Sequence, residues 1–361
     1  MLYTYSNLAL SENWLNATII NILDDGMQRI LAGNELLKWP DILPQERKDI
    51  LRTRYGIKTR IDVFFAEFSK LELEMKQELL KTLRQQSSFP DVFIDDSVCL
   101  KIDFFPKKIQ AAADELFRFL FEEQLKTLFV GADSLRDYHY KKIYSNLNWR
   151  ICPFCGLGYL RAPDGPRHAL DHYLPISKYP FAGADFRNLP PMCSECNSDF
   201  KKNTDILLDD ENKRRHCVDP YNGPIFRISL QDSLPFSGEI VDAIQLPKWD
   251  IKFIGAPQEQ ANNWDRIFKV SERYKRDILD KEFRSWLAHF TAWYIKTYNG
   301  MNSGDEIAAS IPEYIETVIQ DGLSDRAFLK KEVFIVITNE CNHVERGEDM
   351  KNFLSILVKY A

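Results

Sequence analysis

The chain has 361 residues, of which 45% are hydrophobic and 28% are charged, so it is long enough for two or three domains with sizeable cores. Its 24 Phe and 15 Tyr favour an aromatic-rich core and argue against a largely disordered chain. The net charge of −6 argues against a large basic surface for nucleic acid, although an acidic body can carry a local basic site.

The sequence offers no signal for a membrane or for secretion. No stretch reaches the roughly 18 consecutive apolar residues of a membrane helix, and the first residues lack the basic and apolar segments of a signal peptide. Four of the seven cysteines form two Cys-x-x-Cys pairs, a pattern typical of a metal site in a reducing compartment. We therefore expect a cytoplasmic protein with no membrane partner.

Residues 1–145 are predicted to be helical. Apolar side chains recur at spacings of three and four from Phe64 to Leu83, which predicts one helix face, and a segment rich in Gln and Ser follows it. A second helix is predicted at residues 108–129, with Gly131 as its end signal. We expect this region to be a scaffold; the alternative is a surface for a partner or a second copy.

The rest of the chain divides in two. Residues 146–215 concentrate Cys, Pro, Gly, Asn and His and lose periodicity, as expected of a small domain held together by metal. Residues 216–361 return to longer elements and are predicted to be mostly helical. The expected elements are short strands at 227–230 and 249–254 and helices at 273–298 and 311–320. The segment VFIVIT at 333–338 fits either a buried strand or a buried helix.

The two cysteine pairs are Cys152-Pro-Phe-Cys155 and Cys193-Ser-Glu-Cys196. Two such pairs can supply the four thiolates of a tetrahedral zinc site, which is structural because no position stays open for water or substrate. One pair alone would also fit a redox motif, but the presence of two favours zinc. The remaining cysteines stand alone and are expected to be buried apolar side chains: Cys99, Cys217 and Cys341.

Three short motifs lie between and after these pairs. They are Asp171-His172-Tyr173-Leu174-Pro175, then Asn188-Leu189, then Asn197 directly after Cys196, with Lys201 following. In order and spacing, and in their interleaving with cysteine pairs, they resemble the HNH nuclease motif. The resemblance covers about residues 150–205. It implies a ββα-metal module, which is a β-hairpin followed by a helix. With helical regions on both sides of this module, the expected fold class is α+β and predominantly helical.

The residue types suit hydrolysis of a phosphodiester. That reaction needs an activated water, neutralisation of negative charge and help for the leaving oxygen. A divalent ion held by oxygen ligands supplies the last two, and an imidazole such as that of His172 can take the proton from water near neutral pH.

The resemblance assigns a role to each motif residue. His172 corresponds to the general base, Asp171 to the metal-binding acid, Asn188 to the residue that braces the hairpin loop, and Asn197 to a metal ligand from the helix. Because Asn197 is a neutral oxygen ligand, the expected ion is Mg²⁺ or Mn²⁺. Taken singly, these residues would fit a surface hydrogen bond, a turn or a helix cap equally well.

Basic residues near the motif are candidates for nucleic-acid binding. Arg167, Lys201 and Lys202 are expected to contact phosphates as charges. His168 fits either a contact to the scissile phosphate or a structural role.

The resemblance implies a metal-dependent endonuclease that cuts DNA and leaves 5′-phosphate and 3′-hydroxyl ends. The layout is similar to bacterial anti-phage defence nucleases of the Septu type, in which an HNH protein works beside an ATPase. The chain has no phosphate-binding Gly-x-x-x-x-Gly-Lys-[Ser/Thr] loop, so any ATP dependence would come from such a partner. Two alternatives stay open: an RNA or tRNA nuclease, and a zinc-stapled module that binds nucleic acid or protein without catalysis.

Overall fold

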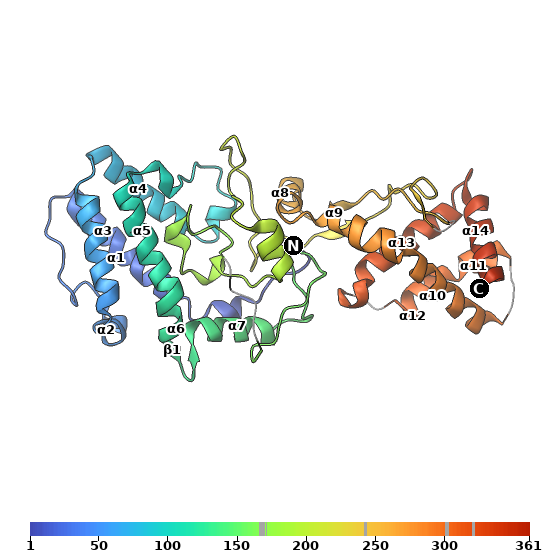
Figure 1. Cartoon of the computed structure of the whole chain (residues 1–361), viewed down its shortest axis with the longest axis horizontal. Coiled ribbons are helices and arrows are strands. Elements are labelled where there is room, and N and C mark those ends of the chain that lie inside the picture. The colour runs from blue at the N-terminus through green and yellow to red at the C-terminus, as the bar shows by residue number, and fades with distance from the viewer. Residues whose placement is uncertain (166–169, 171, 242–243, 300–302, 320–321) are drawn as a thin grey trace. The chain divides into compact units, whose positions relative to one another are not determined.

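The computed structural model in Figure 1 describes the whole chain except residues 166–169, 171, 242–243, 300–302 and 320–321. The described part is predominantly helical, with a few short strands, in agreement with the predicted α+β class. It groups into two compact units. The first comprises Met1, Tyr3–Cys152 and Tyr159–Pro224, and the second comprises Leu2, Pro153–Gly158 and Ile225–Ala361. The three regions proposed along the sequence stay a prediction.

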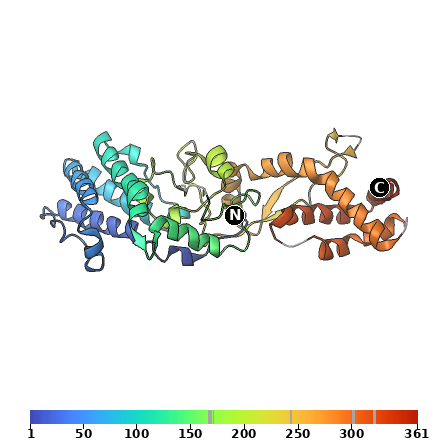
Figure 2. The same ribbon diagram turned by 60° about the horizontal axis from the view of Figure 1, so that its bottom comes forward.

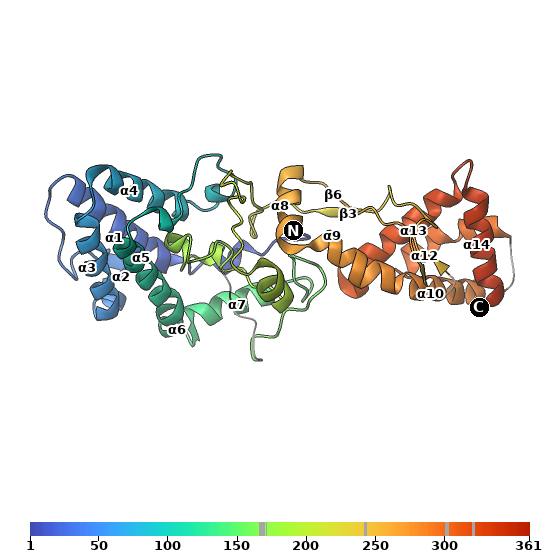
Figure 3. The same ribbon diagram turned by 45° about the horizontal axis from the view of Figure 1, so that its top comes forward.

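The first unit is built mainly from helices. They are α1 (Trp14–Leu31), α2 (Gln45–Leu51), α3 (Tyr55–Ser69), α4 (Leu73–Ser87), α5 (Lys107–Phe119), α6 (Leu125–Thr127) and α7 (Leu135–Ser145). Helix α3 packs along α5, and α1 packs along α4 (Figure 3). Their buried faces share one apolar core that continues into the later segment through Phe181, Phe186 and Leu189.

The apolar stripe from Phe64 to Leu83 belongs to two helices, so the prediction of one helix face is wrong. Helix α3 ends at Ser69 and α4 begins at Leu73, after Glu72 in an extended conformation. The spacing of three and four residues continues across this short break because both helices bury their stripes in the same core. Periodicity alone therefore could not reveal the break.

The helix predicted at 108–129 is confirmed, but its end signal is not. Helix α5 continues through a π-helical turn, Leu120–Gln124, into α6, which ends at Thr127. Gly131 instead lies in the turn between strands β1 (Phe129–Val130) and β2 (Asp133–Ser134), with a φ of +61°. A left-handed φ favours glycine both in a tight hairpin turn and after a helix, so the two settings look alike in sequence.

The later part of the first unit has little regular structure. Its short turns are η5 (Pro180–Ala182), η6 (Phe186–Asn188) and a π-helical turn, η7 (Glu195–Lys201). Among its described residues, isolated antiparallel bridges join Ile151 to Tyr159, Leu170 to Pro191 and Leu208 to Arg214.

The second unit combines two small pairs of antiparallel strands with helices. Strand β3 (Arg227–Ser229) pairs antiparallel with β6 (Lys252–Ile254), which confirms the predicted strands there. Strand β4 (Ile240–Val241) pairs antiparallel with β5 (Ile244–Gln245) (Figure 2). The helices are α8 (Gln258–Phe268), α9 (Val270–Arg273), α10 (Asp280–Tyr298), α11 (Gly304–Ala309), α12 (Ile311–Thr317), α13 (Ala327–Cys341) and α14 (Gly347–Tyr360).

The predicted C-terminal helices are present. A π-helical turn, Tyr274–Leu279, joins α9 to α10, so the helical stretch predicted at 273–298 is continuous. The ambiguous segment VFIVIT lies within α13, whose Val333, Phe334 and Ile337 are buried. None of the described helices combines the length and apolar character needed to cross a bilayer.

The three lone cysteines are buried, as predicted. Burial raises the pKa of Cys99 to about 12 and that of Cys341 to about 11. Both thiols therefore stay protonated at neutral pH and act as small apolar side chains.

Candidate functional site

The four paired cysteines form one cluster. Cys152, Cys155, Cys193 and Cys196 are all buried, and their sulfur atoms lie within 4.8 Å of one another. A tetrahedral zinc ion with Zn–S bonds of about 2.3 Å requires sulfur atoms about 3.8 Å apart. The cluster therefore needs at most a small contraction to hold a structural metal ion such as zinc, with all four positions filled by sulfur.

Local backbone geometry shapes each pair. After Cys155, Gly156 has a φ of +67°, and the backbone N–H of Leu157 lies 3.4 Å from the Cys155 sulfur, which accepts a hydrogen bond. This left-handed φ favours glycine, and a Cβ at Gly156 would in addition displace the end of the Leu2 side chain, 2.4 Å away. A hydrogen bond to sulfur favours the thiolate form that a metal requires.

The second pair leads into a helical turn. The N–H of Asn197 donates to the Cys193 carbonyl at 3.0 Å, which places Cys193 and Cys196 about one turn apart at the start of η7. Asn197 follows directly and is half-buried. The turn ends where Lys202 adopts a φ of +47° and donates its N–H to the Asn197 carbonyl at 2.9 Å.

His172 lies on a segment that runs antiparallel to the segment of Asn188. Leu170 forms a bridge with Pro191, and the N–H of Tyr173 donates to the Asn188 carbonyl at 2.8 Å. No strand is assigned to the described residues of either segment, so the predicted hairpin is not a regular ladder of strands there. Three predicted site residues lie outside the described residues: Arg167, His168 and Asp171.

Asn188 closes the loop between these two segments. Its buried side-chain oxygen accepts from the N–H of Leu174 at 2.6 Å, and its amide donates to the carbonyls of Leu174 and Ala182, both at 3.1 Å. Three hydrogen bonds from one side chain thus hold the two ends of residues 174–182 together. A buried amide satisfied in this way is expensive to replace.

The His172 ring is held by a backbone carbonyl. Its Nε2 lies 2.8 Å from the oxygen of Gly183, and the residue is only 8% exposed. Since a carbonyl can only accept, Nε2 must donate, and Nδ1 then carries the free lone pair of the neutral ring. Burial lowers the pKa of His172 to about 3, opposed by the hydrogen bond to Gly183, and the charges of Lys201, Arg118 and Arg136 lower it further. The ring is therefore neutral at pH 7.

Two of these cations were not predicted from the sequence. The Phe121 ring packs against His172 with 4.3 Å between ring centroids, and the Arg136 guanidinium lies 5.2 Å from the Phe121 centroid. Arg118 precedes Phe121 by one helical turn and pairs with Asp114 at 2.7 Å. These residues belong to α5, the π-helical turn after it and α7. No feature of the nuclease-like motif points to helices so far away in the chain.

The two predicted phosphate-binding lysines differ in environment. Lys201 is buried, and its ammonium group donates to the Lys202 carbonyl at 3.0 Å, whereas Lys202 is exposed. Lys201 is also the largest charge contribution to the low pKa of His172. Lys201 therefore lies near enough for its charge to act on His172.

Buried side chains from the N-terminal helices contact the segment that carries Gly183 and its continuation at Leu189. Asn16 of α1 donates to the Phe181 carbonyl at 3.1 Å and accepts from the N–H of Ala184 at 3.2 Å. From α7, the His139 ring nitrogens lie 3.0 Å from the carbonyl oxygen of Ala9 and 3.3 Å from that of Leu189. Long-range contacts therefore fix the carbonyl that orients His172.

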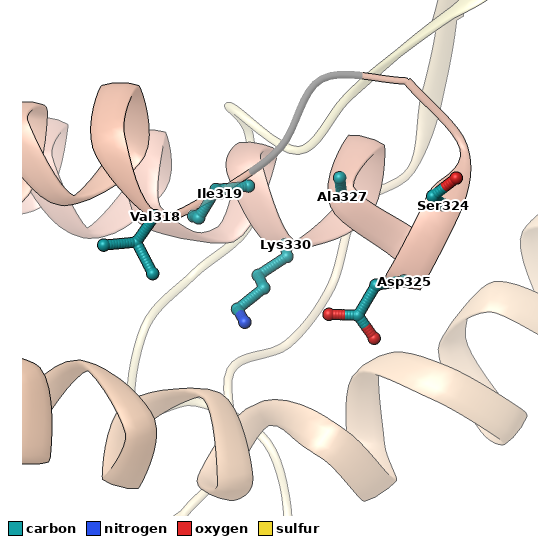
Figure 4. A pocket seen from close by; sticks show the side chains of 6 residues that line it. All are labelled: Val318, Ile319, Ser324, Asp325, Ala327 and Lys330. Carbon is teal, nitrogen blue, oxygen red and sulfur yellow. The ribbon is translucent and has the colours of Figure 1, made fainter.

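The second unit contains a separate cavity of about 180 Å³ beside α13. Figure 4 shows the Lys330 ammonium and the Asp325 carboxylate both extending into it. It contains none of the residues predicted to be functional. Its two opposite charges give no preference for an anionic or a cationic ligand.

Comparison of the chain with protein-family models, with curated proteins and with solved structures finds no match. The function must therefore be argued from the residues of the site.

Proposed function

We propose that this chain is a metal-dependent endonuclease of the HNH type that hydrolyses DNA phosphodiester bonds and uses the four-cysteine cluster as a structural zinc site. One observation carries the proposal. A neutral histidine, His172, lies on a segment paired with that of Asn188, and a helical turn that begins at the second cysteine pair follows them. This is the chain order of a ββα-metal centre.

The geometry around His172 suits a general base. With Nε2 donating to Gly183, the lone pair of Nδ1 is the one available to accept a proton. When that proton comes from water, the water oxygen bonds to phosphorus and the bond to the 3′ oxygen breaks, leaving 5′-phosphate and 3′-hydroxyl ends. Nearby phosphate charge would offset the cations around the ring and raise its basicity.

The proposed catalytic ion is Mg²⁺ or Mn²⁺, held by Asp171 and Asn197. When bound, it would neutralise charge on the phosphate and stabilise the leaving oxygen. Oxygen ligands of this kind select hard cations. Asn197 lies on η7 directly after the fourth cysteine, so a bound zinc would fix the backbone from which this ligand extends.

A role in bacterial anti-phage defence beside an ATPase partner is a further part of the proposal. It rests on the layout of the chain alone. Purification of the chain together with an ATPase from its own host would support this part, and the nuclease proposal does not depend on it.

Plasmid cleavage tests the nuclease proposal. Supercoiled plasmid is incubated with wild type, His172→Ala and the control His289→Ala, each with Mg²⁺, Mn²⁺ or chelator, and with a structured RNA in parallel. His289 is a suitable control because it is exposed, hydrogen-bonded to Tyr314 and part of the second unit. We expect metal-dependent cutting by wild type and by His289→Ala, and a loss of at least about 100-fold in His172→Ala.

Each other outcome has a distinct meaning. Equal cutting by His172→Ala and wild type would refute the assigned base. Cutting of RNA alone would replace DNA as the substrate. Binding of nucleic acid without any cutting, under every metal, would point to a binding module and overturn the nuclease proposal.

A further inference from the structure

Three cations from separate elements converge on His172. Lys201 comes from η7, Arg118 from α5 and Arg136 from α7. Phe121 links Arg136 to the site, because its ring centroid lies 4.3 Å from that of His172 and 5.2 Å from the Arg136 guanidinium. Arg118 and Phe121 are three residues apart on one helical stretch, so their side chains share a face.

The ion pair of Arg118 leaves it able to exchange partners. Its bond to Asp114 is 2.7 Å long, but the two side chains are 41% and 36% exposed. Solvent-exposed pairs of this kind contribute little net stability. A phosphate offers the same guanidinium a charge-assisted, two-pronged contact, which an arginine matches better than a lysine does.

Arg136 is placed differently. Its guanidinium rests near the face of Phe121, a ring that is itself packed against His172. Such a cation–π contact holds the planar guanidinium in position beside the ring that packs on His172. The chain carries a net charge of −6, so a local cluster of cations is the feature most able to attract a polyanion to this site.

We propose that Arg118 and Arg136 bind backbone phosphates of the nucleic acid that enters the His172 site. The helices α5 and α7 then form part of the substrate-binding surface, in addition to supporting the fold. This inference rests on the proposed nuclease function for its choice of ligand. The contacts are to phosphates, so they serve DNA and RNA alike and carry no sequence preference.

Binding of a fluorescein-labelled DNA duplex, with an RNA hairpin in parallel, tests the inference by fluorescence anisotropy over a series of salt concentrations. All proteins are full-length and carry His172→Ala, which separates binding from cutting. We expect Arg118→Gln and Arg136→Gln each to weaken binding by about tenfold at low salt. Each should also reduce the slope of log affinity against log salt by about one.

Matched controls exist for both arginines. Arg29 forms the same type of helical ion pair, with Asp25 at 2.7 Å, and Arg150 makes a similar cation–π contact, with Tyr144 at 4.5 Å. Neither charge is among those acting on His172. Arg29→Gln and Arg150→Gln should bind within about twofold of the parent, with an unchanged salt slope.

The outcomes separate this inference from the proposed function. If Arg118→Gln and Arg136→Gln match their controls, or if no nucleic acid binds, the inference is wrong. If wild type binds but never cuts, the nuclease proposal fails and the phosphate contacts stand. If circular dichroism shows that Arg136→Gln folds poorly, Arg136→Lys replaces it; this variant keeps the charge and should retain most of the salt slope. Arg118→Glu reverses the charge and should weaken binding more than Arg118→Gln.

Discussion

The cysteine cluster and the His172 site overlap in sequence but are positioned by different means. Each cysteine pair takes its geometry from its own neighbours: a glycine turn after Cys155, and one helical turn between Cys193 and Cys196. His172 takes its position from elements far away in the chain, through the Gly183 carbonyl and the Phe121 ring. The first arrangement can be recognised from spacing; the second exists only once the helices of the first unit have packed.

The comparison predicts that damage to the two sites differs in kind. Loss of a cysteine should remove the metal and unfold the surrounding segment, because the described residues between 146 and 224 contain only short helical turns and isolated bridges. Loss of a long-range contact to the His172 loop should leave the metal in place and displace the histidine.

The largest effect is expected for Cys193→Ser. Wild type should contain one zinc per chain, and the variant should lose most of it and several kcal/mol of stability, because a structural zinc site contributes its binding energy to folding. Mass spectrometry of metal content and thermal unfolding measure both. Cys341→Ser is the control, since Cys341 is buried but outside the cluster, and it should keep its zinc. A Cys193→Ser protein with full zinc content would contradict the assignment of the ligands.

The same contrast explains what could be predicted from sequence. Two cysteine pairs predicted a cluster because three-residue spacing already fixes most of the geometry of each pair. Arg118 and Asn16 could not be found, since each lies more than 50 residues before His172 and only the folded core brings it near. The segment Val333–Thr338 stayed ambiguous because a helix buried on most of its surface shows no helical periodicity.

The stability of the protein should fall at low pH because of His139, whose ring contacts the Leu189 carbonyl at the end of the segment that carries Gly183. Burial lowers the pKa of His139 from 6.5 to about 4, and it outweighs the hydrogen bonds to the Ala9 and Leu189 carbonyls that would favour the protonated ring. Between pH 6.5 and about pH 4, His139 is protonated in the unfolded chain and neutral in the folded chain. The stabilisation is therefore complete above pH 6.5 and is lost as the pH falls, by about 3 kcal/mol at pH 4.

Denaturant unfolding at a series of pH values from 7.5 to 4 gives the free energy of unfolding of wild type and of His139→Gln. The difference between the two free energies at each pH is the contribution of His139. Asp185, whose pKa burial raises to about 6, contributes in the opposite direction in both proteins, so the difference isolates His139. The variant should be less stable than wild type at pH 7.5, and the gap should narrow toward pH 4. A constant gap across the range would show that His139 does not titrate as a buried neutral ring.

The smallest effect tests whether the loop needs α1. Asn16→Ala leaves the Phe181 carbonyl and the Ala184 N–H without their side-chain partner, at a cost of about 2 kcal/mol. Because these groups flank Gly183, the nuclease rate should fall in kcat more than in KM, and zinc content should stay at one per chain. Asn146→Ala is the matched control. The exposed side-chain amide of Asn146 donates to the backbone carbonyl of Lys142 and to the Ser145 hydroxyl, both nearby in the chain. If Asn16→Ala has the same kcat as the control, the loop that carries Gly183 keeps its position without the contact from α1. The contrast between a locally built cysteine cluster and a histidine supported by distant elements would then no longer hold.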